Sequence, residues 1–226
     1  MSYKFNFLEF KNFNQDTAIF IENQINSLLK TKSNINIAFS GGNTPLPILE
    51  ILKASKINWE KISFFLVDER DCPNDHLNSN FFNLNNCFFK YISSKSYPVY
   101  NSSKSKFEIA DSYEKKIIKN VSFYKNYPQF DLIILGMGYD GHTASLFPNS
   151  EALVNNSSSF VSNYVSSLDE WRYTLTYPVI QNSKSLILLI NDNKRKKILN
   201  KNLDNKMPIY RIIKESKNLV VLFSKT

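Results

Sequence analysis

The sequence predicts a doubly wound α/β fold, in which a mostly parallel sheet carries helices on both faces. Three apolar runs, at 35–39, 132–135 and 185–190, have the length of buried strands and are too short to be helices. Amphipathic stretches such as 14–30 separate the runs. Strands that alternate with helices form parallel sheets covered on both sides. We therefore expect one domain, residues 1–226, with a ligand site at the carboxyl ends of its strands.

The other elements can be placed in chain order. Residues 150–167 are polar and serine-rich and predict an irregular excursion or lid. Thr44 suits a helix N-cap and Pro45 the first helical position, and Pro178 is expected to end a strand. We expect helices at 14–30, 47–53, 79–89, 106–121 and 194–203, and strands at 35–39, 61–67, 132–135, 172–177, 185–190 and 219–223.

Composition limits the classes of function. No apolar run approaches the roughly 18 residues of a membrane span, and the start of the chain lacks a signal-peptide core, so no membrane partner is expected. Cys72 and Cys87 lack metal-ligand spacing, which favours a reducing cytoplasm. The net charge of +8 comes mostly from scattered lysines, and the dense run 194–197 fits a solvated helix face. A small anionic substrate suits this charge, and we expect a monomer without a nucleic-acid partner.

All five glycines follow two of the predicted strands. Gly41 and Gly42 lie in Ser-Gly-Gly-Asn-Thr-Pro at 40–45, directly after the strand 35–39. Glycines let successive backbone N–H groups turn inward, and a helix N-terminus favours an anion. The alternative is a tight strand-to-helix turn. The segment is not a P-loop, because no Gly-Lys-Ser/Thr follows.

The second glycine group precedes a histidine and a possible helix start. Gly136, Gly138 and Gly141 satisfy the dinucleotide pattern G-x-G-x-x-G, but they fall late in the chain, and no acidic residue closes a second strand about 20 positions later. His142 is one of two histidines, with His76 in a polar segment. Because an unperturbed histidine has a pKa of about 6.5, His142 is a candidate general base.

Arginine is scarce, and two arginines lie at strand ends. Arg70 follows the strand at 61–67, and Arg172 opens the strand at 172–177. A guanidinium in such a place can grip a phosphate through two parallel hydrogen bonds. Each of these arginines could instead pair with surface carboxylates.

These residues together resemble the 6-phosphogluconolactonase family over residues 35 to 180, with a weaker echo to Pro208. Glucosamine-6-phosphate deaminases share its Rossmann-like fold, but they carry Asn-Glu-Pro where this chain has Ser-Leu-Phe-Pro at 145–148, and they lack an equivalent of Arg70. The matching motifs are Ser-Gly-Gly-Asn-Thr-Pro at 40–45, Asp-Glu-Arg at 68–70, Ser-Asn at 79–80, Gly-x-Gly-x-Asp-Gly-His-x-Ala-Ser-Leu-Phe-Pro at 136–148 and Arg-x-Thr-Leu-Thr at 172–176.

The resemblance implies hydrolysis of 6-phospho-D-glucono-1,5-lactone in the oxidative pentose phosphate pathway, without a cofactor or a metal. His142 is expected to be the general base, and Asp140 orients its loop or caps the next helix. Where the family has a glycine before Lys194, this chain has Asn191-Asp192, which leaves the roles of Lys194 and Arg195 open. The expected substrate-binding residues are Gly41, Gly42, Asn43, Thr44, Asp68, Arg70, Gly138 and Arg172. A deaminase-like isomerase and a non-catalytic sugar-phosphate sensor are the alternatives.

Overall fold

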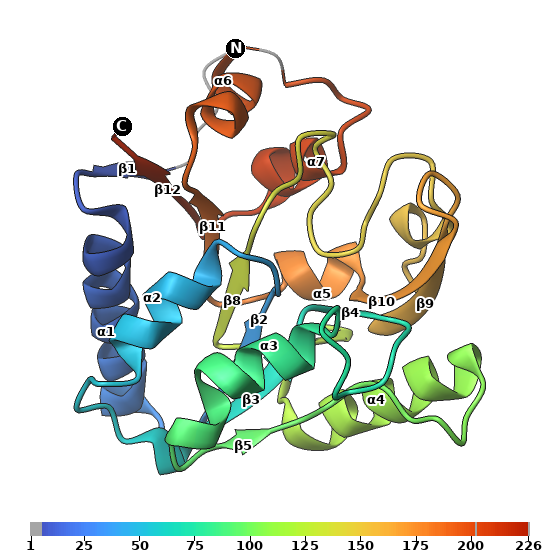
Figure 1. Ribbon diagram of the computed structural model, residues 1–226, viewed down its shortest axis with the longest axis horizontal. Coiled ribbons are helices and arrows are strands. Elements are labelled where there is room, and N and C mark those ends of the chain that lie inside the picture. The colour runs from blue at the N-terminus through green and yellow to red at the C-terminus, as the bar shows by residue number, and fades with distance from the viewer. Residues whose placement is uncertain (1–5, 202, 226) are drawn as a thin grey trace.

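A seven-stranded parallel sheet forms the centre of the protein (Figure 1). The computed structural model describes residues 6–201 and 203–225. The strands lie in the order β1-β12-β11-β8-β2-β3-β5. Their bounds are β1 Asn6–Phe10, β12 Leu219–Ser224, β11 Leu186–Ile190, β8 Leu132–Leu135, β2 Ile35–Phe39, β3 Ile62–Leu66 and β5 Lys95–Ser96. The central strands are almost entirely buried, as their apolar runs require.

Helices cover both faces of this sheet, which confirms the predicted fold class. On one face of the sheet, α1 contacts α2 and α2 contacts α3. On the other face, α5 packs against α7 (Figure 1). Each helix buries an apolar stripe, such as Ile21 and Ile25 of α1. The bounds are α1 Phe13–Thr31, α2 Pro45–Leu52, α3 Asn80–Cys87, α4 Lys106–Asn120, α5 Tyr177–Gln181, α6 Asn193–Lys201 and α7 Pro208–Glu215.

The order of the strands reverses between β2 and β8. These two strands pair in parallel, with Ile37 opposite Leu132 and Phe39 opposite Ile134. From β2 the chain continues outward to β3, and from β8 it continues in the opposite direction to β11. A crevice opens at the carboxyl ends of two such strands, where doubly wound proteins bind their ligands. Both glycine groups of the sequence follow these two strands.

Strand β1 forms one edge of the sheet. Among the described residues it pairs only with β12, with Asn6 opposite Val220 and Phe10 opposite Ser224. The backbone N–H of Lys225 also donates to the Phe10 carbonyl oxygen over 2.8 Å. The N-terminal strand therefore completes the sheet beside the last strand of the chain.

A second, antiparallel sheet corrects the expected irregular segment at 150–167. It has the order β4-β10-β9, with β4 at Asp68–Arg70, β10 at Glu170–Leu175 and β9 at Phe160–Val165. Phe160 and Val165 are buried, whereas the serines that suggested a loop lie mostly before and after the strand. As expected, β10 ends before Pro178, which lies in the first turn of α5.

Other expectations need smaller corrections. The sequence reading missed β1, α7 and several two-residue or three-residue strands, among them the hairpin of β6 (Phe123–Tyr124) and β7 (Tyr127–Pro128). Thr44 occupies the N-cap position of α2 but makes no capping hydrogen bond, because its backbone is already helical. The expected helix at 194–203 crosses residue 202, which lies outside the described residues. In the described part of the chain, no helix is long and apolar enough to cross a bilayer.

Candidate active site

Two loops meet at the crevice between β2 and β8. The glycine loop, residues 40–44, follows β2 and leads into α2. A Cβ atom on Gly41 would lie 1.9 Å from Oδ1 of Asn80, so only glycine permits this approach. Gly42 adopts a φ of +92°, which a residue with a side chain rarely adopts. The close packing on Asn80 and the left-handed turn together shape a loop whose backbone borders the crevice.

The histidine loop, residues 136–142, follows β8 and is folded tightly on itself. The N–H of Gly138 donates to the His142 carbonyl oxygen over 2.8 Å, and the N–H of Gly141 donates to the Gly138 carbonyl oxygen over 3.1 Å. A Cβ atom on Gly138 would lie 2.3 Å from Nδ1 of His142 and 2.6 Å from Oδ1 of Asp140. Gly138 therefore provides the space in which imidazole and carboxylate meet.

His142 and Asp140 form an acid–base pair. Nδ1 of His142 lies 2.6 Å from Oδ1 of Asp140, and the same oxygen accepts the backbone N–H of His142 over 3.1 Å. Burial of the Asp140 carboxyl disfavours its charge, but the hydrogen bond and charge of His142 outweigh this and lower the pKa of Asp140. An ionised Asp140 accepts a proton-bearing Nδ1, so Nε2 is the nitrogen left to act as a base.

The segment after His142 is not the expected helix, and this corrects the sequence reading. Ala144 has a φ of +53°, and Thr143 and Leu146 form an isolated β-bridge instead. Ser145 Oγ donates to Oδ2 of Asp68 over 2.8 Å, which ties the segment to β4. Asp140 therefore has no helix to cap, and its carboxylate contacts the imidazole and the backbone N–H of His142 instead. The lack of a helix also argues against the dinucleotide alternative, whose glycines must open one.

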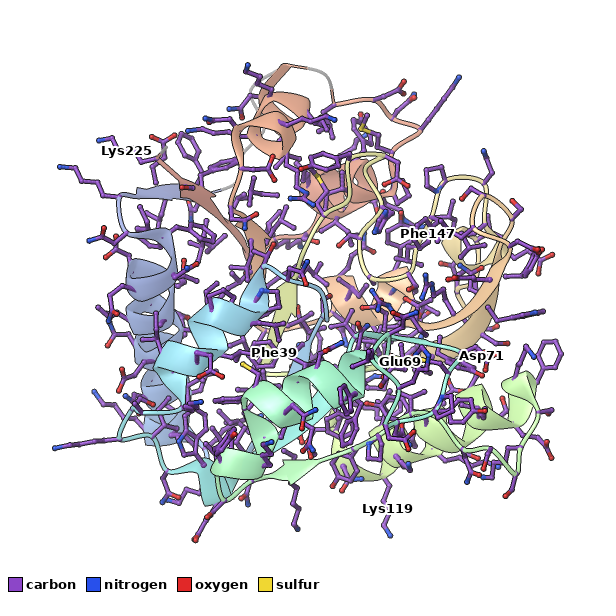
Figure 2. The ribbon with its side chains drawn as sticks, viewed as in Figure 1. Phe39, Glu69, Asp71, Lys119, Phe147 and Lys225 are labelled. Carbon is purple, nitrogen blue, oxygen red and sulfur yellow. The ribbon has the colours of Figure 1, made fainter. Side chains whose placement is uncertain are left out.

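Phe147 packs against His142. Its ring stacks on the imidazole of His142 with the centroids 4.1 Å apart and an interplanar angle of 24°. Figure 2 labels Phe147 in the segment between β8 and β9. The ring of Phe147 and the carboxylate of Asp140 both contact the imidazole, which restricts the positions that Nε2 can take.

Buried Glu69 fixes the position of Arg70. Its carboxylate accepts the backbone N–H groups of Arg70, Asn80 and Phe81 over 2.6–2.8 Å, and the Ser79 hydroxyl over 3.0 Å. Burial raises the pKa of Glu69, and these four donors oppose the shift. The Glu69 carboxylate lies at the N-terminal end of α3 (Figure 2). In the same view, the side chain of Lys119 on α4 points to solvent. Arg70 itself donates through Nη1 to the Asn78 carbonyl oxygen.

A cavity of about 190 Å³ joins these parts into one site. The structure brings most of the predicted site residues to its wall, whereas Asp140 contacts His142 and does not line the cavity. Among the lining residues that the sequence reading did not assign to the site, three have polar side chains: Ser40, Asn80 and Arg195. Ser-Asn at 79–80 was a visible motif, but its reach to Gly41 depends on tertiary packing. The predicted residues on the wall are Gly41, Gly42, Asn43, Thr44, Asp68, Arg70, Gly138 and His142.

Arg172 lies outside this cavity. It sits opposite Arg70 across the β4–β10 pair and lines a neighbouring groove that shares Arg70 with the cavity. Its Nη2 is 2.5 Å from Oε2 of Glu170. Burial, followed by the charge of Arg70, lowers the pKa of the Arg172 guanidinium. The structure thus places Arg172 beside Arg70, the residue predicted to bind phosphate, but does not bring Arg172 to the cavity that His142 lines.

We expect the Asp140→Asn variant to lose roughly 10- to 10³-fold in kcat, because the amide no longer fixes the imidazole tautomer. The lowered pKa keeps Asp140 ionised as the pH falls through its ordinary range, so Asp140 itself does not produce the acid limb of wild-type activity.

The test of Asp140 is a kcat profile from about pH 5 to about pH 8 for both proteins, across the range where histidine titrates. A mutant that keeps the wild-type plateau of kcat would contradict the role of Asp140 as the partner of His142. Asp75→Asn, which changes an exposed aspartate outside the cavity, is the control.

The fold and the site define a class of protein: a doubly wound α/β protein with a glycine loop and a His–Asp pair at the sheet's switch point. Residues 10–221 match the family described as Glucosamine-6-phosphate isomerases/6-phosphogluconolactonase. The chain belongs to this family, which confirms the resemblance drawn from its motifs.

Named relatives agree with this assignment. A 6-phosphogluconolactonase from Thermotoga maritima is 34% identical over 195 residues, with 84% of each chain covered. A 6-phosphogluconolactonase from Synechocystis is 33% identical over 75% of this chain and 72% of the relative. The crystal structure of 6-phosphogluconolactonase from Thermotoga maritima superposes with a TM-score of 0.83 at 29% identity, covering 97% of this chain and 98% of that one.

Proposed function

We propose that this protein hydrolyses 6-phospho-D-glucono-1,5-lactone to 6-phosphogluconate in the oxidative pentose phosphate pathway. The observation that carries the proposal is the His142–Asp140 pair on a cavity that also presents Arg70 and the glycine loop. Relatives that are 33% and 34% identical are named for this activity. A base and an anion-binding region in one cavity are what a phosphorylated lactone requires.

The reaction needs one water molecule and a proton carrier. Nε2 of His142 takes a proton from the water as its oxygen bonds to C1 of the lactone, and the carbonyl becomes an oxyanion. Backbone N–H groups of the histidine loop, which lines the cavity beside His142, are suited to stabilise this charge. The bond from C1 to the ring oxygen then breaks, and the imidazolium returns the proton to that oxygen. A δ-lactone is a reactive ester, so a covalent nucleophile is unnecessary.

The phosphate is assigned to Arg70 and the glycine loop. Arg70 lies on the cavity wall, and its backbone is anchored through Glu69, so its guanidinium approaches the ligand from a rigid strand. A planar guanidinium matches two phosphate oxygens at once. Asp68 and Thr44, also on the wall, are suited to the sugar hydroxyls.

The decisive experiment compares two assays on the purified protein. Acid release from freshly generated 6-phosphogluconolactone, above its spontaneous hydrolysis, is expected. Ammonia release from glucosamine 6-phosphate is not. Ammonia release without lactone hydrolysis would favour the isomerase alternative, and binding of 6-phosphogluconate without either reaction would favour a sugar-phosphate sensor.

We also propose that the protein works in the cytoplasm as a monomer, without a nucleic-acid partner. Both cysteines, Cys72 and Cys87, are free thiols, as a reducing compartment favours. Light scattering coupled to size-exclusion chromatography tests the monomer, for which a mass of 26.3 kDa is expected.

A further inference from the structure

Glu69 is a buried carboxylate that the reaction scheme does not use. It lies on β4 between two residues of the cavity wall, Asp68 and Arg70, but does not line the cavity itself. None of the ion pairs among the described residues includes Glu69. A buried carboxylate without a cationic partner is costly unless hydrogen bonds satisfy its oxygens. The arrangement of its donors therefore shows what this carboxylate holds together.

The two oxygens of Glu69 join β4 to the start of α3. Oε1 accepts the backbone N–H of Arg70 over 2.8 Å and that of Asn80 over 2.6 Å. Oε2 accepts the backbone N–H of Phe81 over 2.8 Å and the hydroxyl of Ser79 over 3.0 Å. A glutamine has only one carbonyl oxygen, and its NH2 group cannot accept, so at least one backbone N–H would face another donor. A carboxylate is needed to hold both pairs of donors.

The start of α3 extends this connection to the glycine loop. Nδ2 of Asn80 donates to the Asp68 carbonyl oxygen over 2.8 Å, which ties the start of the helix back to β4. Oδ1 of the same amide packs against Gly41, where a Cβ atom would lie only 1.9 Å from it. This oxygen has no hydrogen-bond partner among the described residues, so its contact with the loop is steric. The positions of Arg70 and of the glycine loop thus both depend on Glu69.

We propose that Glu69 is a positioning residue that sets the spacing between Arg70 and the glycine loop, and thereby the preference for phosphorylated over unphosphorylated lactones. The inference rests on the proposed lactonase function and on the assignment of the phosphate to Arg70 and this loop. Glu69 acts through its neighbours and touches no substrate. Because a misplacement of about 1 Å can cost about a hundredfold in rate, a small shift of Arg70 relative to the loop is sufficient.

Glu69→Gln should lower kcat/KM for 6-phosphogluconolactone by about ten- to a hundred-fold, because the backbone of Arg70 is no longer held. The loss should appear in KM. The kcat should stay within about threefold, since the hydrogen bonds of Glu69 do not reach His142 or Asp140. For plain gluconolactone, which has no phosphate, kcat/KM should also stay within about threefold. A general loss of stability would instead affect both lactones alike.

Asp131 provides a matched control, because it is also a buried carboxylate. It directly precedes β8, at the opposite end of that strand from the cavity. There it accepts the backbone N–H of Asn36 over 3.0 Å and pairs with Lys32 over 2.6 Å. Asp131→Asn should lower the melting temperature but leave KM for 6-phosphogluconolactone within about threefold.

A double-mutant cycle tests whether Glu69 acts through Arg70. Glu69→Gln should cost less kcat/KM in an Arg70→Ala background than in the wild type. Independent losses in the two single variants would overturn the inference. So would equal losses on the two lactones, or an equal rise of KM in Asp131→Asn. If Glu69→Gln does not fold, Ser79→Ala, which removes one donor from Oε2, enters the same cycle and is judged by the same outcomes.

Binding of 6-phosphogluconate and of inorganic phosphate, measured by calorimetry, separates this inference from the lactonase function. Weaker binding of both anions by Glu69→Gln than by Asp131→Asn supports the role of Glu69, whether or not the wild type hydrolyses lactone. Equal binding by the two variants would overturn it. Absence of lactone hydrolysis by the wild type would instead refute the proposed function.

Discussion

Replacement of His142 by alanine should lower kcat by roughly 10²–10⁴, the usual contribution of a positioned general base. The variant keeps the glycine loop and Arg70, so it still binds substrate but has no group to take the proton from water. The imidazole is partly exposed, and its main packing contact is Phe147. The melting temperature should therefore change by only a few degrees. The measurement is initial acid release at neutral pH, corrected for spontaneous hydrolysis.

The second histidine gives the control for this experiment. His76 is exposed and lies outside the cavity, where its Nδ1 accepts the backbone N–H of Asn78. His76→Ala should retain wild-type activity. If His142→Ala hydrolyses the lactone almost as fast as the wild type, the mechanism through Nε2 is wrong.

Arg70→Ala should weaken the use of 6-phosphogluconolactone far more than the use of plain gluconolactone. A lost hydrogen bond to a charged group contributes roughly 1.5–3 kcal/mol, or about ten- to a hundred-fold in kcat/KM. Arg70→Lys should recover only part of this, since lysine keeps the charge but loses the planar fork. The measurement is a pair of specificity constants, one for each lactone.

The competing view is that Arg70 only stiffens its loop through the Asn78 carbonyl. In that case both lactones should suffer equally, and the melting temperature of Arg70→Ala should fall. Such a result would refute the phosphate role of Arg70 and leave the phosphate to the Gly41–Gly42 backbone of the glycine loop. Because Arg172 faces Arg70 outside the cavity, Arg172→Ala serves as a comparison for the general loss of positive charge.

The sequence predicts strands correctly where burial on both faces requires a continuous run of apolar residues. Strands β2 and β8 match their predicted bounds because they are buried central strands of a parallel sheet, and such strands are apolar throughout. Strand β9 was missed because its buried residues, Phe160, Asn163 and Val165, form neither a continuous apolar run nor a regular alternation, and serines lie around it. Helix α7 was missed although Ile209, Ile212 and Ile213 have helical spacing and are buried.

Only part of the candidate site could be predicted from the sequence. His142 and Arg70 stand directly after strands, so the topology of a parallel sheet brings them to one edge. Asn80 and Arg195 line the cavity from the starts of helices. The spacing of residues in the sequence does not predict where the start of a helix packs against the rest of the fold. The helix expected after His142 failed for a similar reason, because hydrogen bonds from Ser145 to Asp68 and Thr174 fix that segment against another sheet.

The pairing of β1 with β12 also sets an order in time. Strand β1 precedes the other strands of the sheet in the sequence, yet β12, its partner among the described residues, is the last of these strands to be synthesised. Until then, β11 and β1 both lack the neighbour that lies between them, and an apolar strand with an unpaired edge invites association with other chains. Vectorial synthesis thus leaves one side of this sheet open until β12 emerges, and a nascent chain that stops before Leu219 keeps an unpaired edge on β11.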